Sequence, residues 1–321
     1  MNTLQIASII FIFLIQLIIP ILFVCWIWFK KSKSTINLIL KLMTVWSFFI
    51  YIFYAGNWNF LPYLLRYIFL LLLIGSTIKA VRQFKGLPFL EKKKIWGWTK
   101  FVGQFFFSLF FFLVSVKVIS GFWTDEKGID IAFPLKEGVI SHGGNSRIIN
   151  YHQADTTAQH YALDIVKLNG SGLRTTGFFP VDLNEYAIYG DTIFAPCDGK
   201  VVKIQDGLDN VPPRVDVKVN PAGNHIVLQY QNNLIVFAHI LKTSISVSNG
   251  DFVKKGQPIA RVGNSGHTTE PHLHIHAISG TDTSKIIKGG GHGIPIYFDG
   301  RFLTRNDRVK NKKLFVSINS N

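Results

Sequence analysis

The stretch Pro271-His272-Leu273-His274-Ile275-His276 alternates polar and apolar side chains, which predicts a β-strand. Successive side chains of a strand point to opposite faces of its sheet. The three histidines would therefore share one face, while Leu273 and Ile275 would face the core. Imidazoles pack poorly in a core, but their neutral nitrogens bind divalent metals well. A His-x-His pattern alone is equally typical of structural histidines.

The sequence around this stretch, residues 129–321, has the pattern of a soluble β domain. Short apolar runs at 201–204, 226–228 and 234–237 are typical of strands. Turn residues separate these runs, and helical periodicity is scarce. The sequence therefore predicts an antiparallel all-β domain over residues 129–321.

Residues 1–128 are dominated by Phe, Leu, Ile and Trp and predict an α-helical membrane domain. A helix needs roughly 20 apolar residues to cross a bilayer. The predicted spans cover about 4–29, 36–56, 60–80 and 99–122. No carboxylate falls within any of them, which disfavours a transporter, whose ion or substrate path usually needs one.

The charged residues are distributed as unevenly along the chain as the apolar ones. Residues 1–128 hold 14 of the 34 Lys and Arg but 3 of the 19 Asp and Glu, so the basic excess belongs mainly to the membrane domain. The β domain has no basic stripe, so no nucleic acid is expected as a partner. Basic loops after the first and third predicted spans would be cytoplasmic by the positive-inside rule. The sequence predicts a multi-pass plasma-membrane protein whose β domain is extracytoplasmic.

A second polar motif, His160-Tyr161-Ala162-Leu163-Asp164, supplies an imidazole and a carboxylate four residues apart. With one histidine of the 272/274 pair and Asp164, His160 would complete a set of three ligands. Three protein ligands leave a fourth zinc position open for water, the arrangement of a catalytic site. His239 and the unused histidine of the pair are candidates for proton transfer. One Zn²⁺ per chain is expected.

These motifs together resemble the M23 family of zinc metallopeptidases, the lysostaphin-like cell-wall endopeptidases. The resemblance rests on His160-x-x-x-Asp164, the run 191–201, Gly223-Asn224, Ala238-His239, the run 250–259, the segment 263–266 and Pro271-His272-Leu273-His274. It implies zinc ligands at His160, Asp164 and His274, with His239 and His272 as the catalytic pair. It also implies a groove across one sheet face and peptide substrates from peptidoglycan cross-links.

The resulting hypothesis is a membrane-anchored zinc metalloendopeptidase acting on peptidoglycan. The alternative is a non-catalytic module of the same fold that binds the wall or activates another enzyme. His276 stands where many relatives have glutamate, and it is either an outer partner of the ligands or an exposed histidine. His142 and His152 either line the groove or lie on the surface. The bond cleaved, the oligomeric state and any protein partner stay open.

Overall fold

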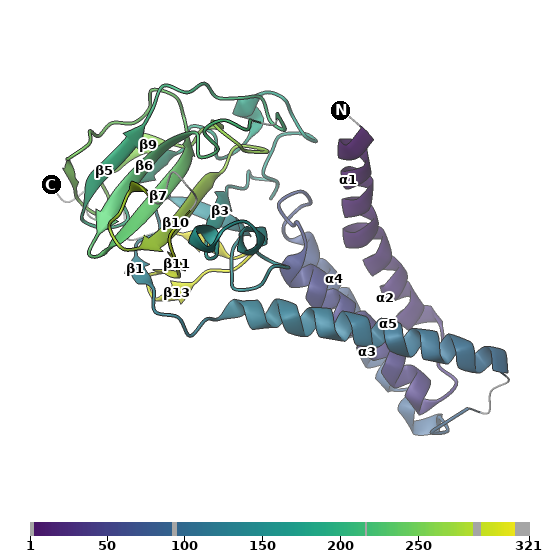
Figure 1. Cartoon of the computed structure of the whole chain (residues 1–321). Helices are drawn as coiled ribbons and strands as arrows, with labels where there is room; N and C mark the ends of the chain where they lie inside the picture. The colour runs from purple at the N-terminus through teal and green to yellow at the C-terminus, as the bar shows by residue number, and fades with distance from the viewer. Residues whose placement is uncertain (1–2, 92–94, 216, 285–289, 312–321) are drawn as a thin grey trace. The chain divides into compact units, whose positions relative to one another are not determined.

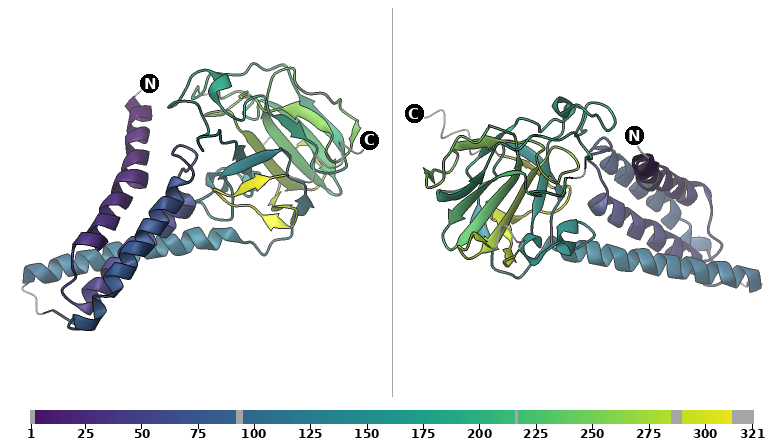
Figure 2. Two further views of the ribbon diagram at one scale, coloured as in Figure 1. Left: turned by 180° about the vertical axis from the view of Figure 1, so that it is seen from behind. Right: turned by 45° about the horizontal axis from the view of Figure 1, so that its top comes forward.

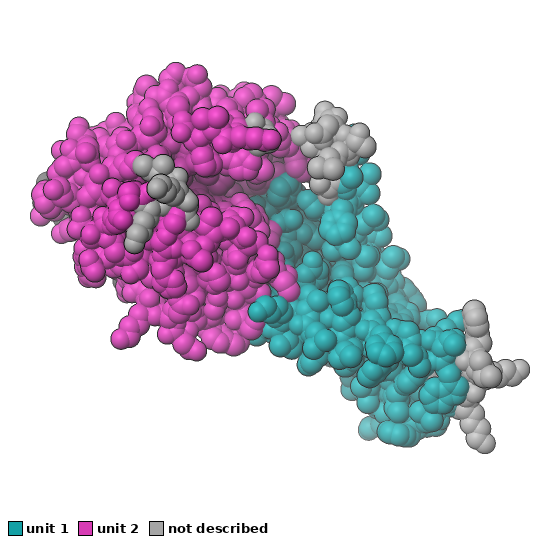
Figure 3. All heavy atoms as spheres, in the orientation of Figure 1, with its two compact units in different colours: residues 1–119 teal, residues 120–321 magenta. Residues whose placement is uncertain are grey.

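The computed structural model describes residues 3–91, 95–215, 217–284 and 290–311. The chain divides into two compact units, Met1–Ile119 and Ser120–Asn321 (Figure 3). The sequence predicted the boundary after residue 128. The segment that follows Ile119 already belongs to the second unit, because the Asn145 backbone N–H donates to the Gly121 carbonyl oxygen at 2.7 Å.

The first unit is helical (Figure 1). Its helices are α1 (Thr3–Phe13), the π-helical turn η1 (Leu14–Ile18), α2 (Ile19–Phe29), α3 (Thr35–Ala55), α4 (Leu65–Val81), the 3₁₀ turn η2 (Phe84–Gly86) and α5 (Ile95–Ile119). The Ser34 hydroxyl caps α3 by accepting the Asn37 N–H at 3.3 Å, as serine at a helix start commonly does.

In the described part of the chain, three helical segments are long and apolar enough to cross a membrane. They are Ile9–Phe29, Thr35–Ala55 and Trp98–Phe122. Three of the four predicted spans are therefore confirmed as candidates, and the span at 60–80 is not. Its counterpart α4 has 17 residues, about 26 Å of helix, which is shorter than a hydrocarbon core of about 30 Å.

The two basic loops of the first unit lie at the same end of it. The backbone N–H groups of Thr35 and Ile36, at the start of α3, donate to the carbonyl oxygens of Pro88 and Phe89 at 2.9 and 3.3 Å. Lys33 also forms an ion pair of 3.6 Å with Glu91. The loop before α3 and the segment after α4 are thus joined, so α4 runs back along the unit to the end where α3 begins.

The second unit is built from short strands and 3₁₀ turns (Figure 2). Its strands are β1 (Ile129–Ile131), β2 (Glu137–His142), β3 (Leu163–Val166), β4 (Thr192–Phe194), β5 (Gly199–Gln205), β6 (Asn224–Tyr230), β7 (Asn233–Ile240), β8 (Phe252–Val253), β9 (Pro258–Arg261), β10 (Leu273–Ser279), β11 (Gly293–Ile294), β12 (Ile296–Phe298), β13 (Arg301–Phe302) and β14 (Arg308–Lys310). Its 3₁₀ turns are η3 (Ser120–Phe122), η4 (Tyr151–Ala154), η5 (Thr157–Gln159) and η6 (Leu183–Glu185).

Within the described residues, nine strands form one sheet in the order β14-β2-β3-β10-β7-β6-β5-β8, with β11 also paired to β10. Its pairings are antiparallel, which confirms the predicted β architecture. The parallel pairing of β1 with β12 lies in a separate small sheet. Strand β10 occupies the middle of the large sheet. Leu273, Ile275 and Ala277 point from β10 into the main hydrophobic core, as alternation predicts.

Candidate metal centre and catalytic histidines

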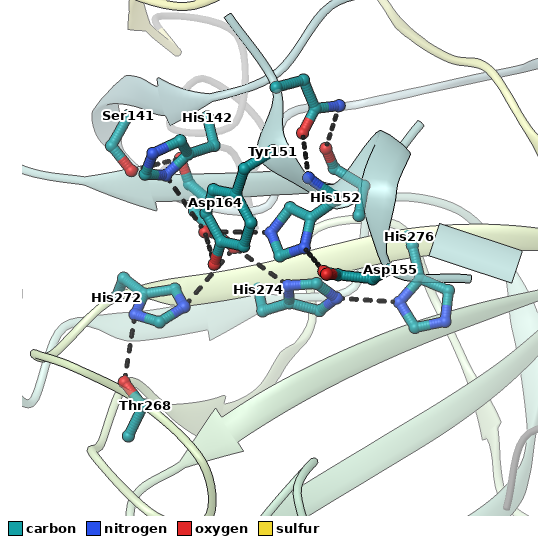
Figure 4. Close-up of polar contacts among 12 residues, drawn as sticks. Ser141, His142, Tyr151, His152, Asp155, Asp164, Thr268, His272, His274 and His276 are labelled. Carbon is teal, nitrogen blue, oxygen red and sulfur yellow. Dashed lines mark hydrogen bonds and ion pairs between the residues drawn. The ribbon is translucent and has the colours of Figure 1, made fainter. Parts of the chain in front are cut away.

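Sheet register brings Asp164 and His274 together. They are paired residues on the neighbouring strands β3 and β10. The His274 Nδ1 atom lies 2.9 Å from the Asp164 Oδ1 atom, and both side chains are buried. Figure 4 shows Asp164 surrounded by imidazoles from several elements. Two of the three residues that the sequence analysis placed in the ligand set are therefore neighbours on one sheet face.

His152 is the third member of this group. It stands on the 3₁₀ turn η4 (Tyr151–Ala154), and its Nε2 atom lies 3.0 Å from the Asp164 Oδ2 atom. The buried side chain of Asn150 holds this turn against β3. Its Nδ2 atom donates to the carbonyl oxygens of Gly144 and Ala162, each at 3.1 Å, and its Oδ1 atom accepts the His152 N–H at 3.3 Å. A loop residue thereby reaches the strand face.

His160 lies outside this cluster. The prediction expected His160 and Asp164, four residues apart, to reach one metal ion. Instead, His160 adopts helical backbone angles after η5, and the Ala162 N–H donates to the Gln159 carbonyl oxygen at 2.9 Å. Strand β3 therefore begins at Leu163. The His160 ring packs on the Tyr161 ring with centroids 4.7 Å apart. His152 thus takes the place in the cluster that the sequence-based reading gave to His160.

A β-bulge turns His239 toward the site. Between Phe237 and Ile240, β7 has one more residue than the matching stretch of β6. In a regular strand His239 would share the face of Phe237, which is fully buried in the core. The bulge, with His239 at φ 63°, sends its ring to the other face. The ring centroid then lies 4.8 Å from that of His272 and 5.8 Å from that of His274.

His239 and His272 are oriented by backbone carbonyl groups. The His239 Nδ1 atom lies 2.9 Å from the Ser265 carbonyl oxygen, and the His272 Nδ1 atom lies 2.7 Å from that of Glu270. A carbonyl oxygen can only accept, so each Nδ1 carries a proton and each neutral ring leaves Nε2 with its lone pair. The His272 Nε2 atom lies 3.4 Å from the Asp164 Oδ1 atom.

A second bulge presents His142 to the same carboxylate. On β2, the register with β3 shifts between Ile140 and His142. Ile140 stays in the core, whereas the His142 Nδ1 atom lies 3.3 Å from the Asp164 Oδ2 atom. The Tyr151 hydroxyl donates to the same oxygen at 3.2 Å, and its ring packs against that of His142.

Two further residues contact the far sides of the clustered rings. The Asp155 Oδ2 atom lies 3.1 Å from the Nδ1 atom of His152. The His276 Nδ1 atom lies 3.0 Å from the Nε2 atom of His274 (Figure 4). His276 is buried. The structure therefore matches the first of the two sequence-based readings of His276, an outer partner of the cluster, and not an exposed histidine.

Burial and the shared carboxylate set the protonation preferences of the cluster. Burial lowers the pKa of His239 well below its usual value, and the neighbouring His272 lowers it further. Burial also acts against charge on His272, but the Asp164 carboxylate outweighs it and raises the His272 pKa. The pKa of Asp164 is held well below its usual range by His152 and His272, although burial opposes this.

The residues present fit a zinc ion. His152, Asp164 and His274 each offer one ligand atom, and these atoms lie within 4.8 Å of one another. The His152 Nε2 atom is buried and lies 3.0 Å from the Asp164 Oδ2 atom, so both atoms can approach one ion. Two imidazoles and one carboxylate are a usual donor set for catalytic zinc. His239, His272 and His274 form a second group that meets the same distance criterion.

Sequence reasoning assigned no clear role to His142, Tyr151, His152 or Asp155. These residues precede Asp164 in a segment without strand or helix periodicity, so spacing could not place them on its face. The one available signal was the closeness of two histidines in the sequence, since His142 and His152 lie in a short polar stretch before the His-x-x-x-Asp motif.

In a comparison with known protein families, part of the second unit matches one family model. Residues 181–285 match the model of peptidase family M23. This segment contains His239, His272 and His274, whereas His152 and Asp164 precede it. The second unit therefore contains an M23 peptidase domain.

Two curated relatives share short regions with the chain. The peptidoglycan DD-endopeptidase ShyB of Vibrio cholerae is 30% identical over 89 residues, 28% of this chain and 18% of that protein. The peptidoglycan DD-endopeptidase ShyA of the same organism is 41% identical over 58 residues, 18% of this chain and 13% of that protein. The chain thus spans less than a fifth of the length of either relative.

Solved structures also show local similarity. A zinc-containing peptidase from Vibrio cholerae is 19% identical, with a TM-score of 0.30, and the match covers 52% of this chain and 39% of that one. The catalytic domain of the prophage-encoded M23 protein EnpA from Enterococcus faecalis is 20% identical, with a TM-score of 0.27 and coverage of 42% and 74%.

Proposed function

We propose that this protein is a membrane-anchored zinc metalloendopeptidase that hydrolyses peptide bonds in peptidoglycan. The observation that carries the proposal is the convergence of His152, Asp164 and His274 on one point, with His239 and His272 beside it. Two histidines and an aspartate would hold the ion and leave one position for water. The match to the M23 model supports the same class of chemistry.

When bound, zinc would lower the pKa of a coordinated water and polarise the scissile carbonyl group. His239 is suited to accept a proton there, because the Ser265 carbonyl holds its Nδ1–H and leaves Nε2 unprotonated. The left-handed backbone of His239 is sparsely populated for a non-glycine residue, and such strain is often found at functional sites. We assign His239 the role of general base.

His272 is suited to stabilise the negative charge that develops on the carbonyl oxygen. The Glu270 carbonyl fixes its ring through Nδ1, and Nε2 faces the cluster. Donation from Nε2 requires a protonated ring. A donor fixed in advance at this point acts in the transition state without reorganising.

The substrate proposal rests on the curated relatives, which are named peptidoglycan DD-endopeptidases. Their short matches to this chain support a peptide cross-link as the substrate class. The wall lies outside the plasma membrane, so the catalytic unit is placed on the extracytoplasmic side. The shared end of the two basic loops supports this topology, because both loops would then face the cytoplasm. It requires α4 to cross as a fourth, short span.

The test uses the full-length chain purified in detergent and incubated with isolated peptidoglycan. We expect mass spectrometry of the released fragments to show newly opened cross-links. A chelator should abolish the release, and added Zn²⁺ should restore it. Release that is unaffected by complete metal removal, or no release by a zinc-loaded protein from any cross-linked wall, would contradict the proposal. The second result would favour a non-catalytic wall-binding module.

A further inference from the structure

His152 differs from the other two proposed ligands in the way it is held. Asp164 and His274 stand on paired strands of the large sheet, so the backbone ladder sets their positions. His152 stands on a 3₁₀ turn of four residues. Asn150 fixes the backbone of that turn, but these hydrogen bonds do not fix the rotation of the His152 ring.

The ring of His152 is held between two carboxylates. Its Nδ1 atom lies 3.1 Å from the Asp155 Oδ2 atom, and its Nε2 atom lies 3.0 Å from the Asp164 Oδ2 atom. An ionised carboxylate only accepts hydrogen bonds, so each ring nitrogen of His152 faces an acceptor. With an ion in the site, the ion would take the position of the proton between Nε2 and Asp164, while Nδ1–H would still donate to Asp155 and hold the ring with its Nε2 lone pair toward the ion.

We propose that Asp155 is a positioning residue that fixes the tautomer and ring orientation of His152 for zinc binding. This inference rests on the proposed zinc site. Asp155 has no part in the ligand group and acts through His152 alone. Histidine ligands commonly donate their second ring N–H to a carboxylate, which orients the ring and increases its basicity.

The position of Asp155 makes the proposal testable without unfolding the domain. Its side chain is 44% exposed, so truncation leaves no cavity in the core. Loss of such an outer carboxylate typically weakens metal affinity by about 10- to 100-fold. Asp155→Asn keeps an oxygen that can accept from Nδ1 but removes the charge, so its effect should lie between those of the wild type and Asp155→Ala.

The experiment measures the zinc dissociation constant of the full-length protein in detergent, by competition with a chromophoric chelator at fixed pH. The matched control is Asp251→Ala. Asp251 is also exposed and also contacts the residue three positions before it, because its Oδ2 atom accepts the Ser248 N–H at 2.7 Å. We expect Asp155→Ala to bind zinc about 10- to 100-fold more weakly than wild type. Asp251→Ala should match wild type.

The metal-free melting temperature separates positioning from folding. Asp155→Ala should melt at the wild-type temperature without metal and lose part of the stabilisation that zinc gives. Unchanged zinc affinity in Asp155→Ala would overturn the inference while leaving the zinc site intact. Equal loss in both variants, or a lowered metal-free melting temperature, would also overturn it. A wild-type protein that binds no zinc would instead refute the proposed function.

Discussion

Asp164 and His274 face each other across neighbouring strands, with Oδ1 and Nδ1 2.9 Å apart. Strand pairing fixes this contact, and the other polar groups of the cluster are arranged around it. His152 reaches the same carboxylate from a loop, whereas His142 and His239 reach the site through bulges. The cluster therefore depends on a rigid pair and on three side chains placed by irregular backbone.

The identity of the third ligand can be tested by comparing two histidines. We expect His152→Ala to reduce bound zinc from about one ion per chain to a small fraction, because only two ligands of the set would remain. His160→Ala should keep its zinc, since that ring packs on Tyr161 away from the cluster. Metal analysis after dialysis distinguishes the two. Zinc loss in His160→Ala with retention in His152→Ala would restore the sequence-based ligand set.

Substitution of His239 should reduce catalysis without reducing metal binding. We expect His239→Ala to retain zinc and lose at least about 100-fold in turnover, the usual size of a general-base contribution. Zinc content and fragment release are measured on the same preparation. If His239→Ala lost its metal while His152→Ala kept it, the ion would belong to the alternative group of His239, His272 and His274.

Substitution of Asn150 should lower both the stability of the domain and its affinity for zinc. Asn150→Ala would remove the donor of the buried Ala162 carbonyl group and leave that of Gly144 with the longer contact from Gln153, at 3.5 Å. We expect a loss of about 2 to 4 kcal/mol in the free energy of unfolding, together with weaker zinc binding. Thermal denaturation with and without zinc measures both effects. Asn249→Ala, at an exposed position, serves as the control and should change neither.

Cys197 should react slowly with thiol reagents. Burial, together with the nearby Asp198, raises its pKa to about 12. A raised pKa lowers the thiolate fraction at every pH below it, and the thiolate is the reactive form. In a Cys25→Ser background, the alkylation rate at pH 8 should be far below that of the same chain unfolded in denaturant. Equal rates in the two states would contradict the prediction.

The number of membrane crossings can be decided by epitope accessibility. Four crossings place the N-terminus and the catalytic unit on the same side, whereas three place them on opposite sides. We expect tags at the N-terminus and after Gly250 to be accessible in intact spheroplasts, and a tag after Gly86 to be protected. A protected N-terminal tag with an accessible Gly250 tag would show that α4 does not cross.

Much of the fold could be predicted because it depends on local patterns. Alternation in 271–276 predicted a strand with its histidines on one face, and β10 has that form. Apolar runs predicted the membrane helices, of which three are confirmed as candidates. The segment at 60–80 is not confirmed as a candidate span, because hydropathy does not show that the turn after α3 leaves only 17 residues for α4.

The sequence by itself determined the antiparallel β domain, the helical unit, and the strand that carries its histidines on one face, because strand alternation and apolar run length are local properties. The tertiary structure decided that Asp164 pairs with His274, and that His152 and not His160 lies beside them. It also showed how His239, a catalytic candidate from the sequence, comes to face the site and not the core. The physical reason is that a helical turn at His160 and a one-residue bulge in β7 each reverse the face that regular spacing implies. Such irregularities are stabilised by contacts with other segments, here those of Asn150 with Ala162, just before β3, and of His239 with Ser265.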